Sequence, residues 1–198
     1  MKIFRKTALI ISFLFANICC FAQEVDMTKG NLSILKGETS INVEMTYEKM
    51  SVGDFSKEAE YIKKKIEEQN AKDPPNGDNW VAEWEAQKKS FFGEKFTLGL
   101  TKFYEVKIDK TAKYTLIFNT KALEPGYSIG VSKRNAGVDG TITLIETGKP
   151  EKKLAVVYVE RKAETMWRGA AFDAKSRIGD AYFVDGVAVG KFFKKNTK

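Results

Sequence analysis

Four strand-like segments follow one another in the second half of the chain, and their short connections restrict the fold more than any other feature. They span residues 113–119, 126–131, 140–146 and 153–160. Glycine and proline mark the links between them, as in Glu124-Pro-Gly and Gly148-Lys-Pro, which is typical of tight turns. Links this short join antiparallel neighbours, because parallel strands require a long crossover connection. The sequence therefore predicts an antiparallel sheet.

The first half of the chain combines one alternating segment with two helical patterns. Residues 38–47 alternate apolar and polar side chains, which predicts a half-buried strand. Leu32 and Ile34 are a candidate short partner strand. A helix is predicted from Asp54 or Ser56 to about residue 70, and a second from residue 78 or 79 toward 103. Gly93 weakens the later half of the second helix, so we expect a kink or break there.

The C-terminal segment has two interpretations. Apolar residues from Ala174 to Phe192 fit the stripe of a helix. Residues 181–190 also read as a hairpin on the Asp185-Gly turn. We favour the helix, because a sheet with one apolar face needs a cover. The predicted fold is α+β: a single domain with an antiparallel sheet of four to six strands covered by two or three helices.

Residues 1–22 have the three-part pattern of a secretory signal peptide. A basic start precedes an apolar run from Ala8 to Ala16, and small residues precede a cleavage site before Gln23. The predicted organisation is signal peptide 1–22, a lead-in segment 23–36 and one domain 37–198. No second apolar span follows, so we expect export without a transmembrane segment. Lipidation of Cys19 or Cys20 is the alternative, although the residues before them match a lipobox poorly.

Cysteine and histidine usage excludes several kinds of chemistry. The chain has no histidine, and both of its cysteines lie within the predicted signal peptide. The mature protein would therefore lack disulfides, thiol nucleophiles, Ser-His-Asp triads and the common zinc sites. We expect no metal and no cofactor. Signal removal leaves 30 basic and 26 acidic residues, an excess too small to predict nucleic-acid binding.

Two pairs of residues are candidate ligand-binding groups, and neither is catalytic. Trp80 and Trp84 lie one helical turn apart, where they form either part of the core or a platform for a sugar ring. Lys133 and Arg134 lie in a glycine-rich stretch that matches no phosphate-binding motif. This stretch is interpreted as a basic hairpin loop with the capacity to hold an anion.

Several short motifs resemble those of uncharacterised secreted proteins of Bacteroidetes. They are the signal ending Phe21-Ala-Gln, a Gly53-Asp-Phe-Ser opening after the first strand, and a closing Arg177-Ile-Gly-Asp-Ala-Tyr with Gly190-Lys-Phe-Phe. The order of elements from Leu35 to Phe193 is also similar to the small periplasmic α/β domain of LpoB-type synthase activators and CsgG-type proteins. This resemblance implies a partner-binding envelope module without catalysis, and it transfers no site residue.

Two functional hypotheses follow from these patterns. The first is a non-catalytic secreted or periplasmic interaction module that binds a protein or glycan of the cell envelope. The alternative is a carboxylate-based enzyme or binding protein acting on envelope or dietary polysaccharide, with the tryptophans as its sugar platform. The ligand, the oligomeric state and the side of the outer membrane stay open.

Overall fold

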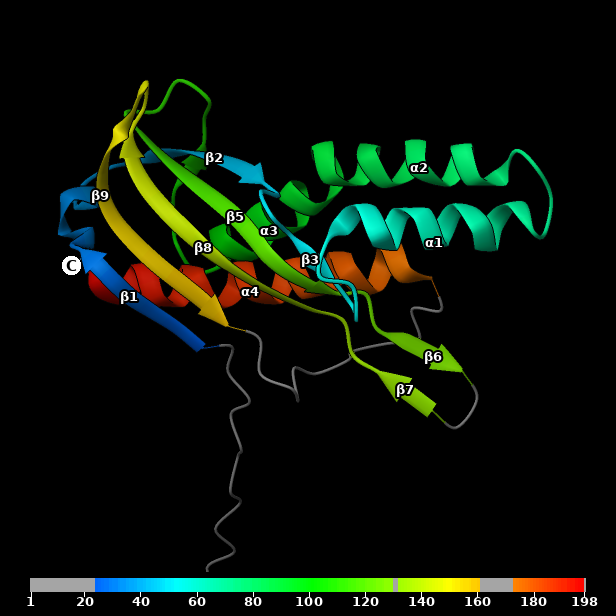
Figure 1. The fold of residues 1–198 in the computed structure, drawn as a ribbon. Helices are drawn as coiled ribbons and strands as arrows, with labels where there is room; N and C mark the ends of the chain where they lie inside the picture. Colours follow the sequence, from blue (N-terminus) through cyan, green and yellow to red (C-terminus); the bar gives the residue numbers. More distant parts are fainter. Residues whose placement is uncertain (1–23, 130–131, 161–172, 198) are drawn as a thin grey trace, which may run out of the picture.

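The computed structural model describes residues 24–129, 132–160 and 173–197. Within these residues, seven strands form one sheet in the order β1-β9-β8-β5-β2-β4, with β3 beside β5. Helices cover one face of this sheet (Figure 1). The strands are β1 (Glu24–Gly30), β2 (Ser40–Thr46), β3 (Ser51–Val52), β4 (Lys107–Ile108), β5 (Tyr114–Glu124), β8 (Gly137–Glu146) and β9 (Lys149–Glu160).

The α+β fold predicted from the sequence is confirmed, with differences in the sheet. β5 pairs antiparallel with β8, and β8 with β9. The link between β8 and β9 is short, as predicted, whereas β5 and β8 are joined through residues 125–136, which include the strand predicted at 126–131. The sheet has more strands than the predicted four to six, and it is mixed rather than wholly antiparallel. β2 runs parallel to β5, because three α-helices separate these strands along the chain and supply the crossover.

Two stretches near the N-terminus differ from the sequence interpretation. The segment assigned as a lead-in, 23–36, contains β1, which pairs with β9 at one edge of the sheet. The short strand predicted at Leu32 and Ile34 is wrong. Leu32–Leu35 is a 3-10 helix, because the side chain of Asn31 accepts a hydrogen bond from the Ser33 amide and starts a turn. Leu32 and Leu35 are buried.

The strand predicted at 126–131 lies outside the main sheet. β6 (Tyr127–Ile129) pairs with β7 (Ser132–Arg134) in a separate two-stranded ribbon, and residues 130 and 131 lie outside the described part. This ribbon projects from the body of the domain below the helices α1 and α2 (Figure 1). It includes the basic stretch that the sequence analysis interpreted as a hairpin.

The helices occupy the predicted segments. α1 spans Glu58–Asn70, and α2 (Asn76–Ala86) continues through a π-helical turn, η2 (Gln87–Phe91), into α3 (Phe92–Thr101). The π-helical turn ends two residues before Gly93, near which the sequence predicted a kink or break. α4 (Ala174–Asn196) is a single helix of 23 residues, so residues 181–190 are helical rather than a hairpin.

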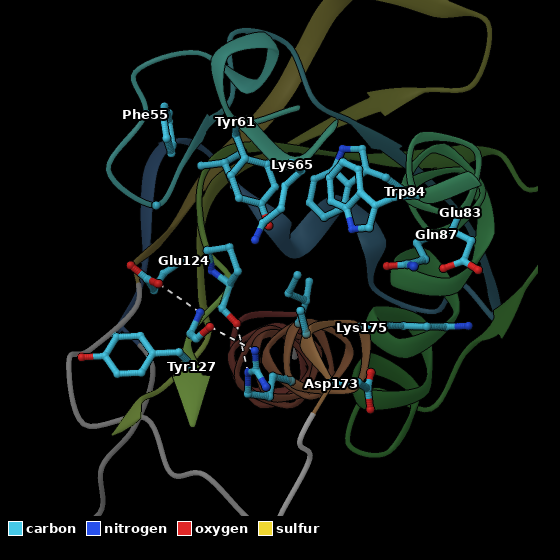
Figure 2. A pocket seen from close by; sticks show the side chains of 18 of the residues that line it. Phe55, Tyr61, Lys65, Glu83, Trp84, Gln87, Glu124, Tyr127, Asp173 and Lys175 are labelled. Atoms are coloured by element: carbon cyan, nitrogen blue, oxygen red, sulfur yellow. Dashed lines mark hydrogen bonds between the residues drawn. The ribbon is translucent and has the colours of Figure 1, made fainter. Parts of the chain in front are cut away.

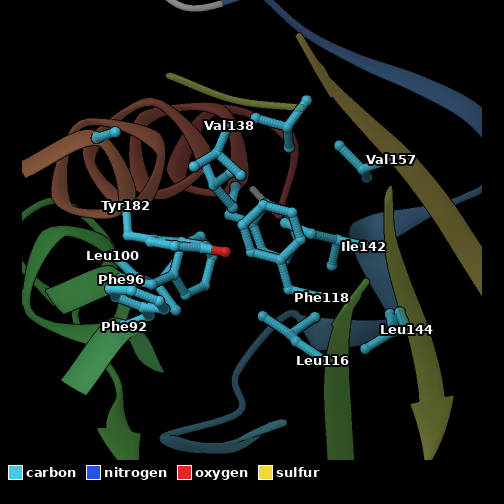
Figure 3. Packing of buried hydrophobic residues seen from close by; sticks show 14 of the residues in the cluster. Phe92, Phe96, Leu100, Leu116, Phe118, Val138, Ile142, Leu144, Val157 and Tyr182 are labelled. Carbon is cyan, nitrogen blue, oxygen red and sulfur yellow. The ribbon is translucent and has the colours of Figure 1, made fainter. Parts of the chain in front are cut away.

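The core lies between the sheet and the helices α3 and α4. Figure 3 shows Tyr182 of α4 beside Phe92 and Phe96 of α3 and Phe118 of β5. The rings of Phe92 and Tyr182 stack with centroids 5.0 Å apart. The hydroxyl of Tyr182, fully buried, forms a 2.8 Å hydrogen bond with that of Thr120. This bond satisfies the one polar atom that the ring carries into the core.

Candidate functional site

A pocket of about 660 Å³ opens at the end of the domain where α1, α2, the start of α4 and the β5–β6 turn meet. We call it the aromatic groove, because several of these elements bring ring side chains to it. In Figure 2, Tyr61 and Trp84 lie on one side of it, and Tyr127 and Asp173 lie across from them. Both tryptophans proposed from the sequence line this pocket.

Stacked rings form the wall contributed by α1 and α2. Trp80 and Trp84 lie one turn apart on α2, and their rings are almost parallel, with centroids 5.6 Å apart and an interplanar angle of 12°. Tyr61 of α1 meets Trp80 edge to face at 5.8 Å. Phe55 extends the row beyond Tyr61, at 6.1 Å. The arrangement matches the geometry that aromatic pairs prefer, so the wall is stable without a ligand.

The two tryptophans differ in exposure. Trp84 is 3% exposed, and its indole N–H donates to Glu58 Oε1 at 2.6 Å. The same carboxylate oxygen accepts from Lys88 Nζ at 2.7 Å. Trp80 is only partly buried. Trp84 is therefore a core residue, whereas Trp80 presents ring surface to the pocket.

The opposite wall is held in shape by ionic and hydrogen-bonded contacts around a turn. Glu124 accepts from the Gly126 amide at 3.0 Å through one oxygen and from Arg134 Nη1 at 3.2 Å through the other. Arg177 of α4 donates to the carbonyls of Pro125 and Gly126 at 3.2 and 3.1 Å. These bonds fix the base of the β6–β7 ribbon against α4.

The two neighbouring basic residues proposed from the sequence differ in their position relative to the groove. Arg134 lines the aromatic groove, where its guanidinium lies 5.7 Å from the centre of the Tyr127 ring and 3.8 Å from Asp54. The neighbouring Glu124 raises the pKa of Arg134 above its usual range. Lys133 is exposed on the same strand and does not line this pocket. Three of the four candidate residues named from the sequence therefore line the groove: Trp80, Trp84 and Arg134.

Two titratable groups of the groove have a fixed state near neutral pH. Burial raises the pKa of Tyr61 to about 12, so its hydroxyl stays protonated. The Ser176 amide, bonded to the Asp173 carboxylate at 2.8 Å, lowers the pKa of Asp173. Asp173 therefore remains ionised as the N-cap of α4.

Sequence reasoning missed several groove residues. Tyr61 is not among the candidate residues named from the sequence, yet it is the buried residue of α1. Tyr127, Glu124 and Arg177 come from segments that only the fold brings together with α1 and α2. The Glu124-Pro-Gly turn sequence was the one local signal, since a carboxylate two residues before a glycine is suited to capping a turn.

The described residues offer neither a metal-binding cluster nor a membrane-spanning helix. They contain no group of three or more acidic, histidine or cysteine side chains placed to hold a metal ion. In the same residues, no helix combines the length and apolar character needed to cross a membrane.

Known proteins show little similarity to this chain. No protein-family model and no curated protein matches the chain. A solved structure of a PelC dodecamer from Paraburkholderia phytofirmans, carrying a point substitution, aligns with a TM-score of 0.33 and 15% identity, over 82% of this chain and 96% of that one. A TM-score this low supports no inference about function.

Proposed function

We propose that the protein is a non-catalytic interaction module of the cell envelope that binds a glycan in the aromatic groove. The observation that carries this proposal is the partly exposed Trp80 ring in a pocket that charged side chains also line. A sugar ring has an apolar face and a rim of hydroxyls. A flat aromatic surface suits the face, and the surrounding charged side chains suit the rim.

The groove is large enough for one or two sugar rings and is already formed. Its volume of about 660 Å³ lies in the range of small-molecule sites. The stacked tryptophans are a contact within one wall, and the Glu124–Arg134 pair is a contact within the other. A pocket that needs little ordering loses less free energy when its ligand binds.

The alternative of a carboxylate-based enzyme receives less support from the groove. Glycoside hydrolysis uses two carboxyl groups, one of them a proton donor or a nucleophile, on either side of the bond. Both oxygens of Glu124 already accept hydrogen bonds from the protein. Asp173 caps α4, and Asp54 lies beside Arg134. Of the four carboxylates that line the groove in the described part of the chain, Glu124 and Asp173 therefore serve its structure, which leaves Asp54 and Glu83 as the one pair for this alternative.

Replacing Trp80 by alanine tests the proposal. We expect affinity for the glycan ligand to fall about tenfold, because a lost aromatic stack is worth about 1 kcal/mol beyond the area it buries. The measurement is affinity electrophoresis through gels containing purified envelope and plant polysaccharides, one per gel. Tyr158→Ala is the matched control, since Tyr158 is a partly exposed aromatic residue on β9, away from the groove.

Two results would contradict this proposal. One is that no polysaccharide retards the unaltered protein, which would leave protein partners as the remaining class. The other is retention of the Trp80→Ala variant equal to that of the parent protein. A thermal unfolding curve for each variant verifies that both are folded at the temperature of the gel.

Export follows in the same proposal from the signal-like residues 1–22. We expect the mature chain to begin at Gln23, because small residues precede that position. Intact-mass measurement of protein recovered from its native host reads the N-terminus directly. Retention of Cys19 or Cys20 with an acyl mass would instead establish a lipid-anchored protein.

A further inference from the structure

The outer edge of β2 is covered by a neighbouring strand only at its beginning, among the residues that the structure describes. The amide of Lys107 donates to the Thr39 carbonyl at 2.9 Å, and the amide of Asp109 donates to the Ile41 carbonyl at 3.0 Å. β4 ends there because the Asp109 carboxylate accepts from both the amide and the hydroxyl of Thr111 at 2.7 Å. This local turn directs the chain away from β2.

The next two outward-facing residues of β2 are Val43 and Met45. Backbone groups alternate sides along a strand, so their N–H and C=O groups point to the same side as the Ile41 carbonyl. In the part of the chain that the structure describes, no strand pairs with this stretch on that side. An uncovered edge of this kind is a template for another extended chain.

A cavity of about 1030 Å³ lies between this edge and the helix formed by α2, η2 and α3. We call it the edge groove. Val43 and Met45 line it on the strand side and are half-buried. The helix side offers the small residues Ser90, Gly93 and Thr97, flanked by charged side chains: Glu85, Lys88, Lys89 and Glu94. A Cβ atom at Gly93 would lie 3.1 Å from Met45 Cγ. The absence of a side chain at this position therefore leaves space between the helix and Met45.

Tyr47 closes one end of the edge groove. Its hydroxyl donates to the Lys88 carbonyl at 2.9 Å, within the π-helical turn. Lys110 lies at the other end, next to the turn that terminates β4. Tyr47 and Lys110 therefore bound the lining of the groove, which lies between β2 and the helix. Figure 1 labels β2 and α3.

We propose that the edge groove binds an extended peptide segment of a partner protein as an added strand beside β2. The reason for a peptide is the pattern of the groups on offer. Val43 and Met45 present a donor and an acceptor at every second residue, which only an extended polypeptide backbone matches. Alternate side chains of that segment would point toward the half-buried Val43 and Met45, so they should be apolar.

This site is separate from the aromatic groove. No residue lines both pockets in the described part of the chain. The amide groups that some glycans carry are substituents of the sugar rings and not part of the chain, so a glycan is a poor match for the strand edge. The peptide proposal can therefore be tested separately from the glycan proposal, and failure of one does not affect the other.

A displayed library of random twelve-residue peptides, selected against the purified protein, supplies the probe. We expect selected peptides, once synthesised, to show alternating apolar residues. Binding should slow hydrogen exchange at the amides of Val43 and Met45. The amide of Glu44 is the internal reference, because it points toward β5 and is already bonded in the ladder.

Two variants locate the binding. Met45→Pro removes an outward donor that the β2–β5 ladder does not use, a position where an edge strand tolerates proline. Ser90→Trp fills the groove from the helix side and leaves the strand backbone unchanged. Each should weaken binding of a selected peptide at least tenfold. Leu98→Trp is the matched control, since Leu98 is 60% exposed on α3 and lines neither pocket.

Four outcomes would overturn the proposal. They are failure to select any peptide, unchanged exchange at Val43 and Met45 on binding, full binding to the Ser90→Trp variant, and a dimer of the protein that Met45→Pro dissociates. The last outcome would assign the edge to a second copy of this chain. Ser90→Trp keeps the test decisive if the proline variant does not fold.

Discussion

Alanine at Gly186 is expected to destabilise the protein by about 3 kcal/mol or more, a large effect for the addition of a single methyl group. Gly186 lies where α4 crosses α3. A Cβ atom there would meet the Phe96 carbonyl oxygen and would lie 2.8 Å from the Leu100 backbone nitrogen. Both obstacles are helix backbone, so no side chain can rotate aside and the two helices must move apart.

The crossing is close because both helices carry glycine at it. Gly99 of α3 faces the backbone of Phe183 and Val187, and Gly190 of α4 faces that of Leu100. Separating the helices would also disturb the stack of Phe92 on Tyr182, whose ring is fully buried. Alanine favours a helix over glycine by about 1 kcal/mol, and this gain is too small to offset the lost contact.

Urea denaturation measures the effect of Gly186→Ala, and Gly93→Ala is the control on the neighbouring helix. Among the described residues, the one close atom at Gly93 is Met45 Cγ at 3.1 Å, the middle of a flexible side chain. Its substitution should change the free energy of unfolding by less than about 1 kcal/mol. Equal losses for the two variants would show that helix separation is not what limits the Gly186 position.

Helix α4 also illustrates what the sequence could predict about the fold. Its apolar stripe identified the helix, although Asp185-Gly is a hairpin signal over the same residues. The glycine that suggested a turn is there for close helix packing, and this distinction requires the position of α3. The short link likewise predicted that β8 and β9 pair as antiparallel neighbours, because that rule depends on connection length alone. It did not predict the pairing of β5 with β8, since the strand expected between them lies in the separate β6–β7 ribbon.

The parts that sequence could not supply depend on neighbours distant along the chain. The alternating pattern of β2 indicated a strand but not its parallel partner, since the pattern is the same in either direction. Trp80 and Trp84 look equivalent at a spacing of four residues. Only the position of Glu58, which receives the indole N–H of Trp84, shows that one is core and the other lines the groove.

In the parent protein, Asp185 is expected to make the free energy of unfolding fall as the pH rises. The substitution Asp185→Asn should remove this dependence. Asp185 lies in the buried stripe of α4 and is 2% exposed, and its Oδ2 has no hydrogen-bond partner among the described residues. Burial raises the pKa of Asp185 well above its usual range, and the charge of Asp139 on β8 raises it further. Tyr182, one turn earlier on the same helix, has its own pKa raised in part by Asp185.

The sign follows from where the proton is held. An unfolded chain releases the Asp185 proton near pH 4, whereas the folded protein keeps it to higher pH. Between these two pKa values the folded state binds one more proton, so stability falls as the pH rises, by about 1.4 kcal/mol per pH unit. The pKa of Asp173 is lowered instead and contributes the opposite slope, equally in parent and variant.

The difference between parent and variant is therefore the informative quantity. Urea denaturation of Asp185→Asn and of the parent protein, repeated from pH 4 to 8, should show the variant gaining relative stability as the pH rises. A constant offset is also expected, because the asparagine amide would itself lack a partner at this position, but an offset does not change with pH. Asp180→Asn, at an exposed position of the same helix, is the matched control. A flat difference for Asp185→Asn would mean that the carboxyl group is ionised in the folded protein and solvated there, which its burial in the α4 stripe argues against.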